Sequence, residues 1–131
     1  MKAVVALAIA ILLRYPDRLA AARRAAAAEG VPLAALLAVG VVEHALGGLD
    51  ATEGARVWPH PGSPDEQATS AAHAIARWTR RCGSLAGGLQ FYHRNDCRVV
   101  RCRARSHRHG REPYASLVLR LAGRLPLGDL P

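Results

Sequence analysis

The sequence predicts an all-α domain of five to six helices, and three observations support this prediction. Half of the residues are hydrophobic but only 5% are aromatic, and alanine dominates the apolar set, which favours closely packed helices over a β-branched, aromatic sheet. Apolar residues recur at intervals of three and four along residues 65–82, the period of an amphipathic helix. A chain of 131 residues has room for one core.

The first predicted helix is the apolar run from Ala3 to Leu13. It follows Lys2 in the order of a secretory signal, but no small-x-small cleavage site comes directly after it. At eleven residues the run is too short to span a bilayer unaided. Residues 1–14 are therefore a signal, an uncleaved anchor or a buried first helix, and Pro16 separates them from the rest.

The main domain is expected over residues 15–125, with a tail over 126–131. An alanine-rich helix, residues 17–29, ends at Gly30. The next helix, residues 33–46, is apolar on nearly every face and should be the central, buried helix.

The second half of the chain begins with a region, residues 47–65, that has no helical period and predicts loops. Helices then follow over residues 65–82, from the capping residue Ser84 to Tyr92, and over residues 114–125.

Glu43 is the one carboxylate of the central helix, and it lies in the last turn. The negative end of the helix dipole and poor solvation both raise the pKa of a carboxyl group in this position. A glutamate with a raised pKa is what a general acid requires at neutral pH. The structural alternative is that Glu43 points into water or pairs with an arginine.

A series of motifs frames this glutamate. Gly30-Val31-Pro32 precedes the apolar helix that ends in Val42-Glu43, and Gly88-Leu89-Gln90-Phe91-Tyr92 and then Tyr114-Ala115 follow it. This order resembles the lysozyme-like lytic transglycosylases, the soluble lytic transglycosylase domain family, over roughly residues 15–125. The resemblance implies a compact lysozyme-like fold and cleavage of peptidoglycan glycan strands, with no cofactor and no metal.

The resemblance also implies roles for individual residues. Glu43 matches the catalytic acid/base, Tyr92 matches a tyrosine that lines the site, and Tyr114 matches the tyrosine that opens the last helix. Both tyrosines are expected to bind substrate. His44 and His93 stand where the family usually has Ser and Asn, and they are expected beside the substrate. The family's Gly-Leu-Met-Gln stretch is absent.

Of the two tryptophans, Trp58 is the better candidate for a platform that stacks on a sugar ring, because it lies in the predicted loop region.

The mechanism that the resemblance implies needs one carboxyl group. Glu43 would protonate the oxygen between N-acetylmuramic acid and N-acetylglucosamine, and then accept the proton of the muramyl 6-hydroxyl as a 1,6-anhydro ring closes. A hydrolase would instead need a second carboxylate to position water. Asp50 and Glu53 are the available candidates.

The three cysteines permit several arrangements. A bridge between Cys82 and Cys97 would staple the short helix that carries Tyr92, and a Cys97–Cys102 pair and free thiols are the alternatives. Cys97, Cys102, His107 and His109 also suggest zinc, although their spacing matches no known finger and arginines surround the histidines.

The net charge of +8 favours anionic partners. Seven arginines lie in residues 94–111 without interleaved aromatic residues, so this segment predicts a solvated loop drawn to anionic envelope polymers, with no specific nucleic acid expected. A periplasmic or secreted location is expected. The alternative functions are a non-catalytic relative that binds glycan, or a small basic helical protein that binds nucleic acid.

Overall fold

The computed structural model is all-α, as the sequence predicts. It describes residues 1–46, 58, 60–101 and 112–130, and within them there is no strand. The helices of this part of the chain are α1 Lys2–Arg14, α2 Pro16–Glu29, α3 Leu33–Leu46, α4 Pro64–Cys82, α5 Leu85–Arg94, α6 Tyr114–Ala122 and the 3₁₀ turn η2 Leu127–Asp129.

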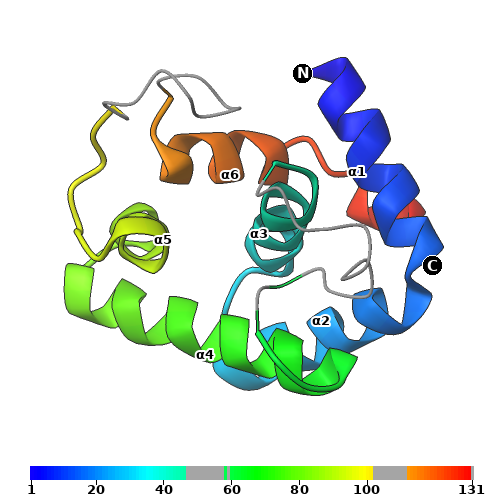
Figure 1. Ribbon diagram of the computed structural model, residues 1–131, viewed down its shortest axis with the longest axis horizontal. Coiled ribbons are helices and arrows are strands. Elements are labelled where there is room, and N and C mark those ends of the chain that lie inside the picture. The colour runs from blue at the N-terminus through cyan, green and yellow to red at the C-terminus, as the bar shows by residue number, and fades with distance from the viewer. Residues whose placement is uncertain (47–57, 59, 102–111, 131) are drawn as a thin grey trace.

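Helix α3 occupies the centre of the molecule. The other helices surround it in Figure 1, and α1, α2, α4 and α6 all contact it. Leu36, Leu37 and Val39 are completely buried. The apolar character of every face of α3 is thereby explained, because each face meets a neighbouring helix.

Helix α1 packs against α2 and α3 rather than standing apart from the domain. Ala8, Ile11 and Leu12 are buried, whereas Leu7 and Leu13 on the other face are about half exposed. No described helix combines the length and the apolar character needed to cross a membrane. The expectation of a buried first helix agrees with this packing, and removal of residues 1–14 as a signal stays a prediction.

Helices α2 and α4 pack closely because their buried faces are made of small side chains. The two helices contact each other, and together they bury eight alanines: Ala21, Ala22, Ala25, Ala26, Ala68, Ala71, Ala72 and Ala76. Side chains as small as alanine allow two helices to approach each other closely.

The ends of α4 are set by local hydrogen bonds. The Ser63 hydroxyl accepts a hydrogen bond from the Glu66 N–H at 3.2 Å, and the Glu66 carboxylate accepts one from the Ser63 N–H at 3.3 Å, which together form a capping box. Gly83 ends the helix in the left-handed region, with a φ of 81°.

One predicted boundary is wrong. The last helix ends at Ala122 rather than at residue 125, because the chain turns at Gly123 and Arg124 ahead of Pro126. Leu125 is nevertheless buried, so its apolar side chain belongs to the core without belonging to the helix.

Helices α4 and α5 form a tight hairpin. The Ser84 hydroxyl accepts a hydrogen bond from the Gly87 N–H at 3.0 Å and caps α5, and a disulfide joins Cys82 to Cys97 across a Cα separation of 5.4 Å. The predicted pairing of these two cysteines is confirmed, and the alternative partner, Cys102, lies outside the described residues. A side chain on Gly88 would meet the backbone of Thr79, so the two helices touch directly at this glycine.

We predict that Gly88→Ala destabilises the domain by about 1–3 kcal/mol, the usual cost of overpacking a core. A Cβ at this position would lie 2.5 Å from the Thr79 nitrogen and 2.7 Å from its Cα, which only a shift of α5 can relieve. Thermal unfolding followed by circular dichroism measures the loss. Gly123→Ala is the control, because its Cβ would come no closer than 3.5 Å to another atom; equal melting temperatures for both variants would contradict the tight contact.

We predict that loss of the Cys82–Cys97 bridge lowers the free energy of unfolding by about 3 kcal/mol, the entropic estimate for a closed loop of about fifteen residues. Denaturant titration of a Cys82→Ser, Cys102→Ser double variant measures it, since this protein cannot form a substitute pair. Cys102→Ser alone should retain wild-type stability, and a loss as large as that of the double variant would show that Cys102 takes part in the native bridge.

Candidate active site around Glu43

The candidate site is centred on Glu43, which lies in the last turn of α3 with its side chain partly buried. The Tyr114 hydroxyl donates a hydrogen bond to Glu43 Oε1 at 2.8 Å. Burial raises the pKa of Glu43, and the Tyr114 hydrogen bond offsets part of this effect by stabilising the carboxylate. No salt bridge reaches Glu43 from any described residue. An arginine partner, the structural alternative, is therefore absent from this part of the chain.

Tyr114 is held in place from two directions. It is the first residue of α6 and only 1% exposed, and the ring of His93 stacks on its ring with the centroids 4.3 Å apart and the planes 4° from parallel. Burial, followed by the charge of Glu43, raises the pKa of Tyr114 well above its usual value. Tyr114 therefore stays a neutral hydrogen-bond donor at physiological pH.

The start of α6 depends on a side chain from α5. Pro113 precedes α6 and provides no side-chain cap. Instead, the Ala115 N–H donates to Gln90 Oε1 at 3.1 Å, and Gln90 is only 1% exposed. A buried amide on α5 thus satisfies one of the unpaired N–H groups of α6 and fixes the direction in which Tyr114 enters the site.

Tyr92 lies on α5 and is the second tyrosine of the site. Its hydroxyl forms a hydrogen bond with His60 Nε2 at 2.9 Å. Burial raises the pKa of Tyr92, and the nearby charge of Glu43 adds to the effect. Burial also lowers the pKa of His60, which favours the neutral imidazole. The structure therefore brings Glu43, Tyr92 and Tyr114 together, as the sequence predicts.

Two of the predicted substrate contacts need correction. Trp58 is completely buried and its indole N–H donates to the Leu36 carbonyl at 3.2 Å, so neither ring face is available to a sugar. Tyr114 is also too buried to meet a glycan, and it acts on Glu43 instead. Sequence alone could not show that the Trp58 side chain is bonded to α3.

Several predicted residues lie outside the part of the chain that the structure describes. Helix α3 includes His44, but its side chain is not described, and the same holds for the whole of Asp50, Glu53, His107 and His109. The sulfur of Cys97 is engaged in the disulfide, so it is not a thiolate ligand for zinc. No cluster of three metal-ligating side chains occurs among the described residues.

Sequence reasoning missed His60 and Gln90. Each meets a partner more than twenty positions away in the chain, Tyr92 for His60 and Ala115 for Gln90. The only signal in the sequence for Gln90 was an amide inside an apolar helical stretch. His60 gave no signal, because a single histidine in a predicted loop has no periodicity to place it.

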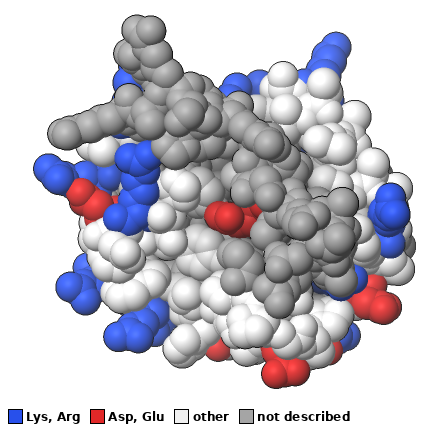
Figure 2. Space-filling model, in the orientation of Figure 1, with Lys and Arg blue, Asp and Glu red and all other residues white. Residues whose placement is uncertain are grey.

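The described charged side chains are unevenly placed on the face shown in Figure 2. Lysine and arginine side chains of the described residues lie mainly toward the edge of this face, and a carboxylate group near its middle borders uncharged described atoms on one side.

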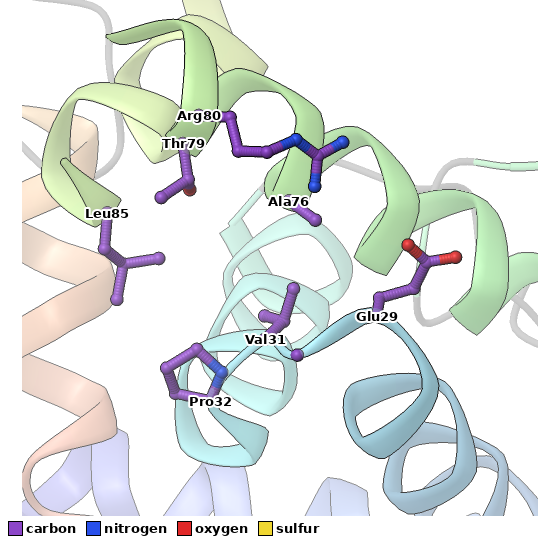
Figure 3. Close-up of a pocket in the computed structure, with 8 residues that line it drawn as sticks. Glu29, Val31, Pro32, Ala76, Thr79, Arg80 and Leu85 are labelled. Atoms are coloured by element: carbon purple, nitrogen blue, oxygen red, sulfur yellow. The ribbon is translucent and has the colours of Figure 1, made fainter. Parts of the chain in front are cut away.

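A pocket of about 330 Å³ lies near the start of α3, where Glu29, Val31, Pro32, Arg80 and Leu85 line it (Figure 3). On the exposed surface, Glu29 Oε2 lies 3.3 Å from His73 Nδ1. The eleven positions from Pro32 to Glu43 correspond to about 16 Å of helix, so this pocket lies at the opposite end of α3. Among the described residues, Glu43 is the carboxyl group that is hydrogen-bonded to a buried tyrosine, and the pocket beside Glu29 has no such pair.

Comparison with known proteins adds no assignment: no family model, no curated protein and no solved structure matches the chain. The case for the site consequently depends on its own residues.

We predict that Glu43→Gln stabilises the protein at neutral and alkaline pH. The folded-state pKa of Glu43 is raised, so folding favours the protonated form, and the charged form costs stability as the pH rises above the ordinary pKa of glutamate, about 4.3. The variant and the wild type should therefore unfold at similar temperatures at about pH 3.5, where glutamate is protonated in both the folded and the unfolded state. As the pH rises above about 4.3, the melting temperature of the variant should become higher than that of the wild type. A variant less stable than wild type at pH 8 would contradict the raised pKa.

Proposed function

We propose that this protein is a lytic transglycosylase that cleaves the bond between N-acetylmuramic acid and N-acetylglucosamine in peptidoglycan. The observation that supports the proposal most directly is the partly buried Glu43 carboxyl, with a raised pKa and a fixed hydrogen bond from Tyr114. A carboxyl group tuned in this way can hold a proton near neutral pH and release it to a leaving group.

The proposed reaction uses Glu43 twice. Its carboxylic acid protonates the glycosidic oxygen while the bond from that oxygen to the muramyl C1 breaks, and N-acetylglucosamine leaves as a free alcohol. The resulting carboxylate accepts the proton of the muramyl 6-hydroxyl as that oxygen bonds to C1. Glu43 returns to its acid form, the sugar ends as a 1,6-anhydro ring, and no water is consumed.

The two tyrosines suit this cycle. The Tyr114 hydrogen bond stabilises the carboxylate that exists between the two proton transfers. Burial keeps the pKa of both Tyr92 and Tyr114 high, so neither phenol loses its own proton to the carboxylate. A single carboxyl group could then act as acid and base in turn, without losing its proton balance to either phenol.

The rest of the molecule agrees with an envelope substrate. The Cys82–Cys97 disulfide is compatible with an extracytoplasmic location, and we propose a periplasmic or secreted enzyme. The net charge of +8 would draw the protein to anionic envelope polymers around the glycan strands.

A non-catalytic relative that only binds glycan is the second candidate. The observation that favours it is the absence of the Gly-Leu-Met-Gln stretch, which in the family that the chain resembles builds the floor of the cleft. Such a protein would sediment with murein and release nothing from it.

We predict that Glu43→Gln lowers the rate of murein release by at least about 10²- to 10⁴-fold, the range assigned to general acid/base catalysis. The amide retains the shape of the side chain but cannot donate and recover a proton. Release of soluble fragments from purified murein, with circular dichroism to verify the fold, gives the measurement. Glu29→Gln is the matched control, since Glu29 is also a helix-terminal, partly exposed glutamate; it ends α2, close to the start of α3 and therefore away from Glu43.

The products discriminate between mechanisms. Anhydro-muropeptides, about 18 Da lighter than the hydrolytic products because ring closure replaces water, are expected from a reaction that uses the substrate's own hydroxyl group. Reducing muramic acid ends, together with an Asp50→Ala or Glu53→Ala variant as inactive as Glu43→Gln, would instead identify a two-carboxylate hydrolase. Murein binding without release by the wild type would support the non-catalytic relative.

A further inference from the structure

We propose that the exposed face of α1 binds the surface of an anionic lipid bilayer. Helix α1 contacts α2 and α3 on one side, and its other side is open to solvent. Binding through this open side does not depend on the reaction proposed for Glu43, so failure of one proposal leaves the other standing.

The exposed face of α1 is apolar along most of the helix. Its exposed residues recur at intervals of three and four positions, which places them on one side of the helix. The apolar members of this face are Ala3, Ala6, Leu7, Ala10 and Leu13. A helix face that meets only water usually carries polar side chains, so this face is suited to an apolar partner.

Both ends of this face are basic. Lys2 and Arg14 are each four positions from an alanine of the face, so both cations lie on the exposed side of α1. Among the described residues, neither of them forms a salt bridge. The Arg14 and Arg18 guanidinium groups lie 5.9 Å and 4.9 Å from the centroid of the Tyr15 ring, which gathers positive charge where α1 ends. Residues 1–16 include no acidic residue.

An apolar centre with cations at both ends matches the surface of an anionic bilayer. Apolar side chains can enter the boundary between headgroups and acyl chains, while the long side chains of Lys2 and Arg14 reach the negatively charged headgroups. The 13 residues of α1 correspond to about 20 Å of helix, which is shorter than the roughly 30 Å of the hydrocarbon core. Helix α1 would therefore lie in the plane of the surface, with its other side still packed on α2 and α3.

A second copy of the chain fits this face poorly. A strip about 20 Å long and about 10 Å wide offers about 200 Å², whereas a stable interface buries about 800 Å² on each partner. Because both ends of the face are positive, two copies would bring like charges together in a parallel and in an antiparallel arrangement. A nucleic acid would need cations along the face, where α1 has alanine and leucine.

The position of α1 in the fold leaves the candidate site accessible. In Figure 1, α1 lies at the edge of the molecule, and α5, which carries Tyr92, lies on the opposite side of α3. A bilayer in contact with the exposed face of α1 would therefore have α5 on the side of the domain that is turned away from the membrane.

Flotation of the full chain with lipid vesicles tests the proposal. The wild type should float with vesicles of equal parts phosphatidylglycerol and phosphatidylcholine, and much less with phosphatidylcholine alone. A Leu7→Gln, Leu13→Gln double variant should lower the partition coefficient by at least about tenfold, because two half-exposed leucines lose their apolar surface. A Lys2→Gln, Arg14→Gln double variant should lose the preference for anionic vesicles.

A Val99→Gln, Val100→Gln double variant is the matched control. These valines are 42% and 48% exposed, close to the 48% and 52% of Leu7 and Leu13, and an arginine flanks the pair on each side. They belong to the segment that follows α5, on the opposite side of α3 from α1 (Figure 1). This variant should bind anionic vesicles as the wild type does.

Three outcomes of flotation would overturn the proposal: a wild type that does not float with anionic vesicles, a leucine variant that floats as well as the wild type, or a valine variant that loses as much binding. Sedimentation without lipid should give a monomer, and a dimer that the leucine variant dissociates would assign the face to a second copy instead. Glutamine and leucine have similar helix propensities, and circular dichroism verifies that each variant is folded.

A fluorescent label gives a second measurement that retains both leucines. In a Cys102→Ser background, Ala10→Cys attaches an environment-sensitive dye to the middle of the exposed face, since Cys82 and Cys97 are joined in the disulfide. The emission of the dye should shift to the blue on anionic vesicles. Ser70→Cys, at an exposed position of α4, should show no shift. Equal responses at the two positions would contradict binding through α1.

Discussion

The hydrogen bond between Tyr114 and Glu43 joins the two elements on which the site depends. It connects the last turn of the central helix to the first residue of α6, between positions that are 71 residues apart in the chain. Because α3 is apolar on every face, the surrounding helices must cover it, and this covering also withdraws Glu43 from water. The packing that stabilises the domain is therefore the same packing that raises the pKa of the carboxyl group.

A series of contacts connects the disulfide to this hydrogen bond. The Cys82–Cys97 bridge and the close approach of Gly88 to Thr79 fix α5 against α4. From α5, Gln90 caps the first turn of α6, whose own N-terminus has a proline and no capping side chain. The position of the Tyr114 hydroxyl is thus determined by α5 as much as by α6. A change in the α4–α5 hairpin would therefore alter the hydrogen bond of Glu43, although neither Cys82 nor Cys97 contacts Glu43.

The sequence was sufficient for features that depend on local patterns. The all-α class and the central position of α3 follow from periodicity and composition, and the structure agrees with both. The Cys82–Cys97 pair was one of the arrangements that the spacing permitted, and the structure selects it. It was insufficient where a long-range contact decides the role of a side chain. Trp58 lies in a region without helical period, which suggested exposure, yet its indole is covered and bonded to α3. The hydrogen bond between His60 and Tyr92 likewise joins residues 32 positions apart, which no local pattern encodes.

Burial and hydrogen bonding act on Glu43 in opposite directions, and both effects serve the proposed reaction. Burial raises the pKa of the carboxyl group and so favours the acid that would protonate the glycosidic oxygen. Tyr114 donates a hydrogen bond to the carboxylate and would stabilise the base that accepts the proton of the 6-hydroxyl. In the proposed reaction, each protonation state of Glu43 would therefore be stabilised by surroundings already in place, and such preorganisation would let one carboxyl group act first as acid and then as base.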